Sequence, residues 1–275
     1  MIVELYLDDA WVESSSYAGT LAIMKRYNFV MRQLGFTVHY KKSSPRPTQS
    51  MDYLGCQFDS RIGAIRLKKE WLSSLESDWK KYKSSKTARN LRRVLGKLAF
   101  ASSLDARLRA FSSKAYKQVG NRQKAEIVDL SSKARRHLTF AIKKCYSIVF
   151  YTIENYKERI CITTDASSHG YGWWDNKSNQ DHYGKWHYST EEWKKHSTYA
   201  ETVTAIKALK ERAIPGALNI IRSDNTTTVS IINSGSSNKE GLNDLAIDLS
   251  KWAFTHNIIY SAVHISGKEN TRADT

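Results

Sequence analysis

The chain has 275 residues, of which 41% are hydrophobic and 25% are charged, and its formal net charge is +16. This composition excludes a wholly disordered chain, and the length suffices for two modest domains or one large one. No apolar run is long enough to span a membrane, so no membrane partner is expected.

Residues 1–67 are predicted to form one helix among short strands. Apolar residues recur at steps of three and four over residues 17–34, which predicts a helix. Asp8 and Asp9 lie between the first two β-prone segments, which predicts a hairpin with an acidic turn. The predicted strands of this part are residues 2–6, 10–12, 36–40, 53–58 and 64–67.

Residues 68–155 are predicted to be a basic helical segment, helical throughout as far as about residue 148. Between Arg66 and Lys144 there are 22 Lys and Arg residues but only 6 Asp and Glu residues, and the rest of the chain is neutral overall. A positive charge concentrated in one segment attracts a polyanion such as DNA or RNA, because binding of its Lys and Arg residues to phosphates releases counterions. The alternative is a merely solvated helical face, but the size of the surplus favours DNA or RNA as the partner.

Apolar stripes at helical spacing give this segment its predicted core, with basic residues left on the surface. The stripes begin at Trp71, Leu91 and Leu130. Three basic residues beside the second stripe are expected to project from one side and to bind phosphates. These nucleic-acid-binding candidates are Arg92, Arg93 and Lys97.

Residues 156–275 alternate strands with helices, a pattern typical of a mixed α/β layer fold. The predicted strands are residues 159–164, 170–174, 185–188, 218–222 and 258–265. The predicted helices are residues 198–212, 226–233 and 242–256.

Four carboxylates occur where this pattern could bring them to one place. Asp165 and Asp224 each follow a strand, Glu201 is expected in the first turn of a helix, and Asp274 follows the last strand. Clustered like charges resist ionising together unless a cation neutralises them, and carboxylate oxygens suit Mg²⁺ or Mn²⁺. Plainer alternatives remain from spacing alone. Glu201 could close a capping box with Thr198, Asp224 could be an N-cap, and the others could be turn and tail residues.

Four motifs in the last block resemble those of retroelement RNase H domains, and they follow the order found in that family. They are Thr163-Thr-Asp-Ala-Ser167, Tyr199-Ala-Glu201, Arg222-Ser-Asp-Asn-Thr-Thr227 and His264-Ile-Ser-Gly-Lys-Glu-Asn-Thr-Arg-Ala-Asp274. The resemblance implies a mixed five-stranded sheet with helices. It also implies that Asp165, Glu201, Asp224 and Asp274 bind catalytic metal for cleavage of RNA in an RNA–DNA hybrid. Ser266 replaces the family's usual Pro, and the family's final helix does not follow Asp274 in this sequence.

Three motifs in the first block resemble those of reverse transcriptases. They are Tyr6-Leu-Asp-Asp9, the segment from Gly35 to Ser43, and Tyr53-Leu-Gly55 with the hairpin that follows it to Leu67. The resemblance implies a metal-binding, catalytic role for Asp8 and Asp9, protonation of departing pyrophosphate by Lys42, and a primer-grip-like hairpin. The fingers and the rest of the palm would then lie on an upstream polypeptide.

Together the motifs resemble the C-terminal part of a retroelement reverse transcriptase/RNase H polyprotein, closest to DIRS-like (tyrosine-recombinase) retrotransposons. The implied fold is α/β (α+β). By this resemblance, residues 1–67 would form the C-terminal part of the palm with the primer-grip-like hairpin, residues 68–155 the basic helical thumb or connection, and residues 156–275 an RNase H-like domain truncated at its last helix.

Two rival functions remain open beside the enzyme. One is a non-catalytic nucleic-acid-binding relic or domesticated scaffold, and the other is a module completed in trans by another subunit. The intact set of four carboxylates favours the enzyme. The three cysteines match neither zinc nor disulfide spacing, which favours an intracellular protein of the cytoplasm or nucleus.

Overall fold

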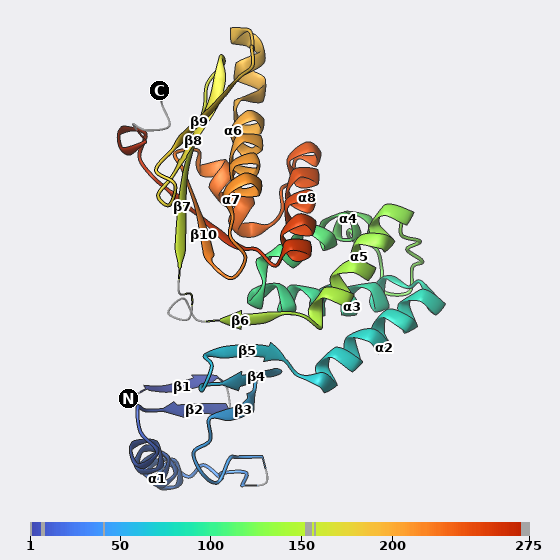
Figure 1. Ribbon diagram of the computed structural model, residues 1–275. Helices are drawn as coiled ribbons and strands as arrows, with labels where there is room; N and C mark the ends of the chain where they lie inside the picture. The colour runs from blue at the N-terminus through green and yellow to red at the C-terminus, as the bar shows by residue number, and fades with distance from the viewer. Residues whose placement is uncertain (1, 7–8, 41, 152–155, 157, 271–275) are drawn as a thin grey trace.

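Strands in three sheets and a series of α-helices follow one another in the computed structural model, which describes residues 2–6, 9–40, 42–151, 156 and 158–270 (Figure 1). A sheet-rich N-terminal part is followed by a helical middle and then by a five-stranded sheet with its own helices. This mixed α/β architecture confirms the predicted fold class.

The N-terminal part contains two small sheets and one long helix. Its elements are β1 (Ile2–Tyr6), β2 (Asp9–Glu13), α1 (Tyr17–Gln33), β3 (Ser50–Tyr53), β4 (Cys56–Asp59) and β5 (Ala64–Leu67). The hairpin of β1 and β2 and the helix lie where the sequence predicts them. Trp11 of β2 contacts Tyr53 and Phe58, with ring centroids 5.4 and 4.9 Å away, so the hairpin packs on the sheet that contains β3 and β4.

Two predicted strands of this part are wrong. Residues 36–40 form no strand, because no neighbouring strand pairs with their backbone and the Phe36 N–H instead donates to Met31 O at the end of α1. Residues 53–58 do not form one strand, because Tyr53 ends β3 and Cys56 begins β4. Leu54 and Gly55 both have positive φ, 46° and 81°, and such a two-residue turn joins β3 to β4 in a tight hairpin.

The helical middle consists of α2 (Lys69–Ser85), α3 (Ala88–Leu104), α4 (Arg109–Val119) and α5 (Ser132–Cys145), with the short 3₁₀ helix η1 (Ala106–Leu108) before α4. The predicted apolar stripes supply its buried core, including Leu75, Leu91 and Leu138. The prediction that this part is helical throughout is wrong for residues 120–131. This extended loop is fastened to α2 by a 2.7 Å hydrogen bond from the Tyr82 hydroxyl to Val128 O.

A strand at the end of the helical middle returns to the N-terminal part. β6 (Val149–Tyr151) pairs antiparallel with β5 and completes a sheet of order β3-β4-β5-β6. The helices α2 to α5 are therefore inserted between two adjacent strands of one sheet.

The last part confirms the predicted five-stranded mixed sheet, whose order is β11-β10-β7-β8-β9. β7, β8 and β9 are antiparallel neighbours, whereas β10 is parallel to both β7 and β11. Its elements are β7 (Arg159–Ala166), β8 (Gly170–Asp175), β9 (Asp181–Lys185), α6 (Thr190–Arg212), β10 (Leu218–Ser223), α7 (Thr226–Ser234), α8 (Glu240–His256) and β11 (Ile259–His264).

The third strand of this sheet lies earlier than the sequence predicts. β9 covers residues 181–185, whereas residues 186–188, which were predicted to belong to this strand, lie outside the sheet. The backbone N–H groups of Trp186 and Tyr188 donate to His169 and Ser168, at the turn between β7 and β8. Residues 186–188 therefore wrap around that turn before α6 begins.

An ion pair between the buried Asp175 carboxylate and the partly exposed Arg212 fixes β8 to the end of α6. The Asp175 side chain is 2% exposed, lies 2.7 Å from Arg212 Nε and also accepts hydrogen bonds from Ser178. Asp175→Ala leaves the guanidinium group unpaired, so we expect a loss of about 3 kcal/mol in the free energy of unfolding, measured by urea denaturation. Asp59→Ala, which breaks the exposed pair with Arg61, is the control and should lose much less. Equal losses in the two variants would contradict a special role for the pair of Asp175 and Arg212.

Candidate metal centre and nucleic-acid surface

Two parallel strands and one helix bring three carboxylates together. β10 pairs with β7 so that Arg222 lies opposite Thr163, and Asp224 and Asp165 follow two residues further along. Glu201 comes from α6, which packs against β7 (Figure 1). One carboxylate oxygen of each acidic residue lies within 4.8 Å of the others, and all three side chains are half-buried.

Hydrogen bonds beside the three carboxylates hold their elements in place. Thr202 of α6 and Thr228 of α7 are fully buried, and their hydroxyl oxygens lie 3.0 Å apart. The Thr164 hydroxyl donates across the β7–β10 pair to Arg222 O, at 3.4 Å. The elements that carry the carboxylates are therefore fixed before any ligand binds.

Glu201 lies in surroundings that disfavour its charged form. Burial, followed by the charges of Asp165 and Asp224, raises the pKa of Glu201 to about 8, although a hydrogen bond from Asn225 opposes the shift. At neutral pH Glu201 is thus mainly protonated unless a cation joins the cluster. Hard carboxylate oxygens on three sides are the donors that Mg²⁺ and Mn²⁺ prefer, so these residues fit such an ion.

Helix capping does not account for these carboxylates. The expectation that Glu201 lies in the first turn of its helix is wrong, because α6 begins at Thr190 and a capping box of Ser189 and Glu192 closes its N-terminus. The N-cap of α7 is Asn225 and not Asp224, because the Asn225 side chain accepts from Thr228 N. Other residues cap both helices, so capping does not explain why Glu201 and Asp224 lie at this place.

The fourth predicted ligand, Asp274, lies outside the described residues. The segment before it passes over the ends of β10 and β7. His264 Nε2 lies 3.0 Å from Asp224 O, and Asn270, which is 1% exposed, donates through Nδ2 to Thr164 O at 3.3 Å. Asn270 lies within the motif that runs from His264 to Asp274, and the motif alone predicts no role for it. Its burial beside the strand that carries Asp165 is visible only in the fold.

The predicted polymerase residues lie apart from this cluster. Asp8 is outside the described residues, and Asp9 is exposed at the start of β2. Lys42 is exposed at the edge of a hollow of about 460 Å³ beside β3 and β4. The structure thus does not bring Asp9 or Lys42 to the carboxylates of the five-stranded sheet.

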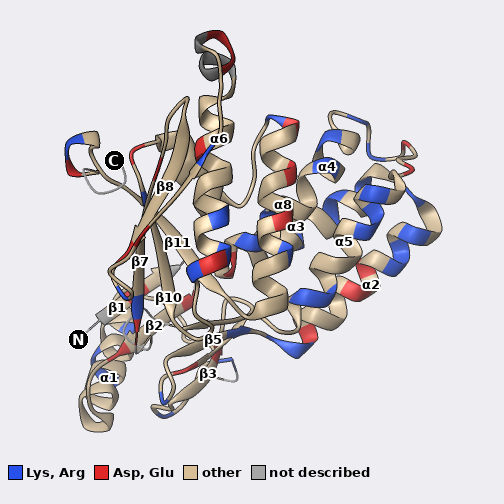
Figure 2. Ribbon diagram, turned by 45° about the horizontal axis from the view of Figure 1, so that its top comes forward, with Lys and Arg blue, Asp and Glu red and all other residues tan. Residues whose placement is uncertain are grey.

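The basic residues of the middle are spread along α2 to α5 (Figure 2). Of the three nucleic-acid-binding candidates, two already have partners in the protein. Arg92 Nη2 donates to the backbone oxygens of Gly120 and Arg122, at 3.1 and 2.6 Å. Lys97 forms an ion pair of 2.8 Å with Asp78 on α2. The expectation that the candidates project from one side is therefore wrong, because Arg92 and Lys97 contact different elements.

Arg93, the third candidate, is exposed along the seam between α2 and α3. Lys97 contacts Asp78 near one end of this seam, and Asn90 donates to the Ser85 hydroxyl, at 2.7 Å, near the other. These two contacts set the register of the two helices. Lys81, which is also exposed, lies between them on α2, close to the level of Arg93. We call Lys81 and Arg93 the seam pair.

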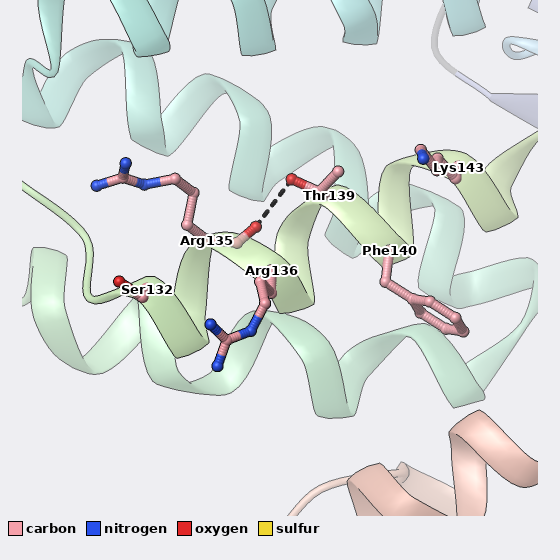
Figure 3. A pocket seen from close by; sticks show the side chains of 6 residues that line it. All are labelled: Ser132, Arg135, Arg136, Thr139, Phe140 and Lys143. Carbon is pink, nitrogen blue, oxygen red and sulfur yellow. Dashed lines mark hydrogen bonds between the residues drawn. The ribbon is translucent and has the colours of Figure 1, made fainter.

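One face of α5 forms a second cationic surface, around a hollow of about 410 Å³ (Figure 3). Arg135 is paired with Asp129 at 3.0 Å, whereas Arg136 and Lys143 are exposed two helical turns apart. Among the residues that the structure describes, no carboxylate lines this hollow. Its lining residues are Ser132, Arg135, Arg136, Thr139, Phe140 and Lys143.

In the part of the chain that the structure describes, the helices are too short or too polar to cross a bilayer.

Changing Glu201 to Gln should remove the pH dependence of stability that this residue causes. Its pKa is about 8 in the folded chain against an ordinary 4.5, so its stabilising proton is lost as pH rises through about 8. The free energy of unfolding of the metal-free wild type should therefore fall between about pH 5 and pH 8.5, by up to about 1.4 kcal/mol per pH unit. Its melting temperature should fall with it. Glu201→Gln should lack this fall. At high pH, added Mg²⁺ should raise the stability of the wild type but not that of the variant.

The matched control is Glu211→Gln, an exposed glutamate on the same helix, which should keep the wild-type pH profile. Melting curves with EDTA and with Mg²⁺ give the readout. Parallel pH profiles for the wild type and Glu201→Gln would contradict the clustered arrangement.

Several solved structures resemble this chain over all or part of its length. The chain is similar to the foamy viral protease-reverse transcriptase dRH in complex with double-stranded DNA, with 14% identity, a TM-score of 0.51, and coverage of 96% of this chain and 46% of that one. Further neighbours are the foamy viral protease-reverse transcriptase in complex with an RNA/DNA hybrid and LC11-RNase H1 in complex with an RNA/DNA hybrid. The first has 15% identity and a TM-score of 0.46 over 95% of this chain and 35% of that chain. The second has 19% identity and a TM-score of 0.34 over 42% of this chain and 91% of that chain.

No protein-family model matches the sequence, and no curated protein does. The chain spans less than half the length of the first two neighbours. What the likeness to the first of these neighbours shows is the fold alone.

Proposed function

We propose that this chain is the C-terminal part of a retroelement reverse transcriptase/RNase H protein, and that it hydrolyses the RNA strand of RNA–DNA hybrids with Mg²⁺ or Mn²⁺. The observation that carries the proposal is the convergence of Asp165, Glu201 and Asp224 within 4.8 Å from three separate elements. The reverse transcriptase/RNase H-like fold supports the reaction class, and the quoted motifs support a DIRS-like origin.

The three side chains act as a preformed ligand set. Their oxygens hold the cation, and the raised pKa of Glu201 means that binding displaces a proton from this residue. When bound, divalent ions in such a site activate water and stabilise the leaving oxygen of a phosphodiester. Asp274 is proposed as the fourth ligand, since the segment up to Asn270 already runs past the cluster.

The rival is a non-catalytic relic or scaffold that only binds nucleic acid. Three carboxylates in mutual repulsion destabilise a folded chain, and they do nothing for phosphate binding, because they repel phosphate as well. Their retention at one half-buried place favours the nuclease. The two functions differ in a cleavage assay, because the scaffold binds hybrid without cutting it.

The N-terminal part supports the proposal of an incomplete polymerase palm. All 17 residues of α1 are described, and none of them is buried. Leu5 of β1 and Leu34 at the end of α1 are each 66% exposed. We assign residues 1–67 to the palm, 68–155 to the thumb or connection and 156–275 to the RNase H-like domain. An upstream palm and fingers polypeptide would cover the exposed apolar residues and complete the polymerase site of Asp8, Asp9 and Lys42.

Asp165→Asn should abolish divalent-metal-dependent cleavage of a labelled RNA–DNA hybrid, because it removes a central anionic ligand while keeping the shape of the side chain. The melting temperature should change by only a few degrees. Asp181→Asn, an exposed acid on β9 of the same sheet, is the control and should cut like the wild type. If Asp165→Asn cuts as fast as the wild type, the assignment of the site is wrong.

Changing both residues of the seam pair, Lys81 and Arg93, to Ala should weaken hybrid binding in a salt-dependent way. Each lost phosphate contact flattens the slope of log affinity against log salt by about one unit, so the double variant should lose about one to two units. Arg92→Ala should change the slope less, because Arg92 already binds the backbone of the 120–122 turn.

Lys210→Ala, an exposed lysine at the end of α6, is the control for a general loss of charge. Fluorescence titrations between 50 and 200 mM salt measure the slopes. The same slope in the wild type and the double variant would show that the seam pair only solvates the helices.

A further inference from the structure

We infer that the interface between the helical middle and the five-stranded-sheet part holds the basic helices at a fixed distance from the carboxylate cluster, and that Arg107 is the residue that positions one part on the other. The inference rests on the proposed function, because it concerns how a bound hybrid reaches both surfaces at once.

One continuous apolar core crosses the interface. Leu242, Ala246 and Ile247 of α8 are buried in the same cluster as the core residues of α2 to α5. On α8, Phe254 packs against Phe111 of α4 and Phe140 of α5, with ring centroids 6.4 and 6.1 Å away. Two parts of a chain usually move relative to each other unless their interface is large and apolar, and this interface has a shared core.

Arg107 lies in η1, between α3 and α4, and makes three kinds of contact. Its Nε and Nη2 donate to Asp105, at 2.9 and 2.6 Å, and its Nη1 donates to Ile258 O, at 2.5 Å. Its guanidinium carbon also lies 4.2 Å from the ring centroid of Phe254. Asp105 holds the planar group in place so that it grips the corner between α8 and β11. Lysine cannot reproduce this contact, because it lacks the flat, forked donor group.

Direct backbone contact and polar pairs add to this grip. Gly235, at the end of α7 with φ of 66°, lies so close to η1 that a Cβ there would be 2.5 Å from Ala106 O. Lys114 of α4 forms ion pairs of 3.3 Å with both Glu240 and Asp244 of α8. The contact therefore resists both separation and rotation of the two parts.

The gripped corner leads directly to the cluster. β11 begins at Ile259, next to the corner, and pairs in parallel with β10, after which Asp224 follows. A shift at Arg107 would thus move the ends of β10 and β7, where Asp224 and Asp165 lie, relative to the seam pair on α2 and α3. When two binding surfaces are joined stiffly, a ligand gains affinity only once it spans both, and then it gains sharply.

The test is cleavage of blunt RNA–DNA hybrids that lengthen by one base pair at a time. For the wild type, kcat/KM should rise about tenfold or more over the one or two base pairs that first let the hybrid span both surfaces. In Arg107→Ala, and more weakly in Arg107→Lys, the rise should spread over several base pairs and shrink by about tenfold, while the shortest hybrids are cut at the wild-type rate. Arg109→Ala removes an exposed charge two residues away and should keep the sharp step.

A second readout needs no activity. Spin labels at Ser73→Cys on α2 and Lys210→Cys on α6, both exposed, report the distribution of distances between the two parts. This distribution should be narrow in the wild-type background and broad in Arg107→Ala. If that variant does not fold, Lys114→Ala should broaden it in the same direction.

The two claims fail in different ways. A wild type that cuts no hybrid but keeps a narrow distance distribution overturns the proposed function and leaves the interface intact. A wild type that cuts without a length step, or an Arg107→Ala variant that keeps both the step and the narrow distribution, overturns the inference.

Discussion

The parallel pairing of β7 with β10 is the constraint on which the candidate site depends. It sets Asp165 and Asp224 at one edge of the sheet, and α6, packed on the same strands, adds Glu201. Burial, and after it the negative charges of Asp165 and Asp224, raise the pKa of Glu201. Apolar packing and buried threonine contacts maintain an arrangement that the charges alone would push apart, and a divalent cation would relieve this strain. Both the position of the three carboxylates and their oxygen donors therefore favour a divalent cation as the ligand.

Much of the fold can be predicted from local patterns, because long amphipathic helices and buried strands carry a clear periodicity. The failures occur where tertiary partners decide. Residues 36–40 alternate as a strand does but find no neighbouring strand, and the Leu54-Gly55 turn divides what appears to be a single strand. The start of α6 lies at Thr190, and not at residue 198 as predicted, because Ser189 and Glu192 form a capping box there.

The candidate site was predictable only in part. Motif order gave all three clustered carboxylates, although they come from distant positions in the chain. Sequence could not reveal which cations are already engaged, and Arg92 and Lys97 have partners inside the protein whereas Arg93 does not bury its charge. Nor could it show Arg107 at the corner of α8 and β11, because that contact joins residues 151 positions apart. A contact between the helical middle and the five-stranded-sheet part produces no periodic pattern in the sequence of either part.

The central claim is that the clustered carboxylates make this chain a nuclease selective for the RNA of a hybrid. The most direct measurement compares strand cleavage by the wild-type chain on four matched duplexes, labelled on either strand, with Mg²⁺, with Mn²⁺ and with EDTA. We expect cuts in the RNA strand of the RNA–DNA hybrid, with either ion but not with EDTA, and intact DNA–DNA and RNA–RNA duplexes. Binding of the hybrid without any cleavage in either ion, or equal cleavage of its DNA strand, would contradict the claim.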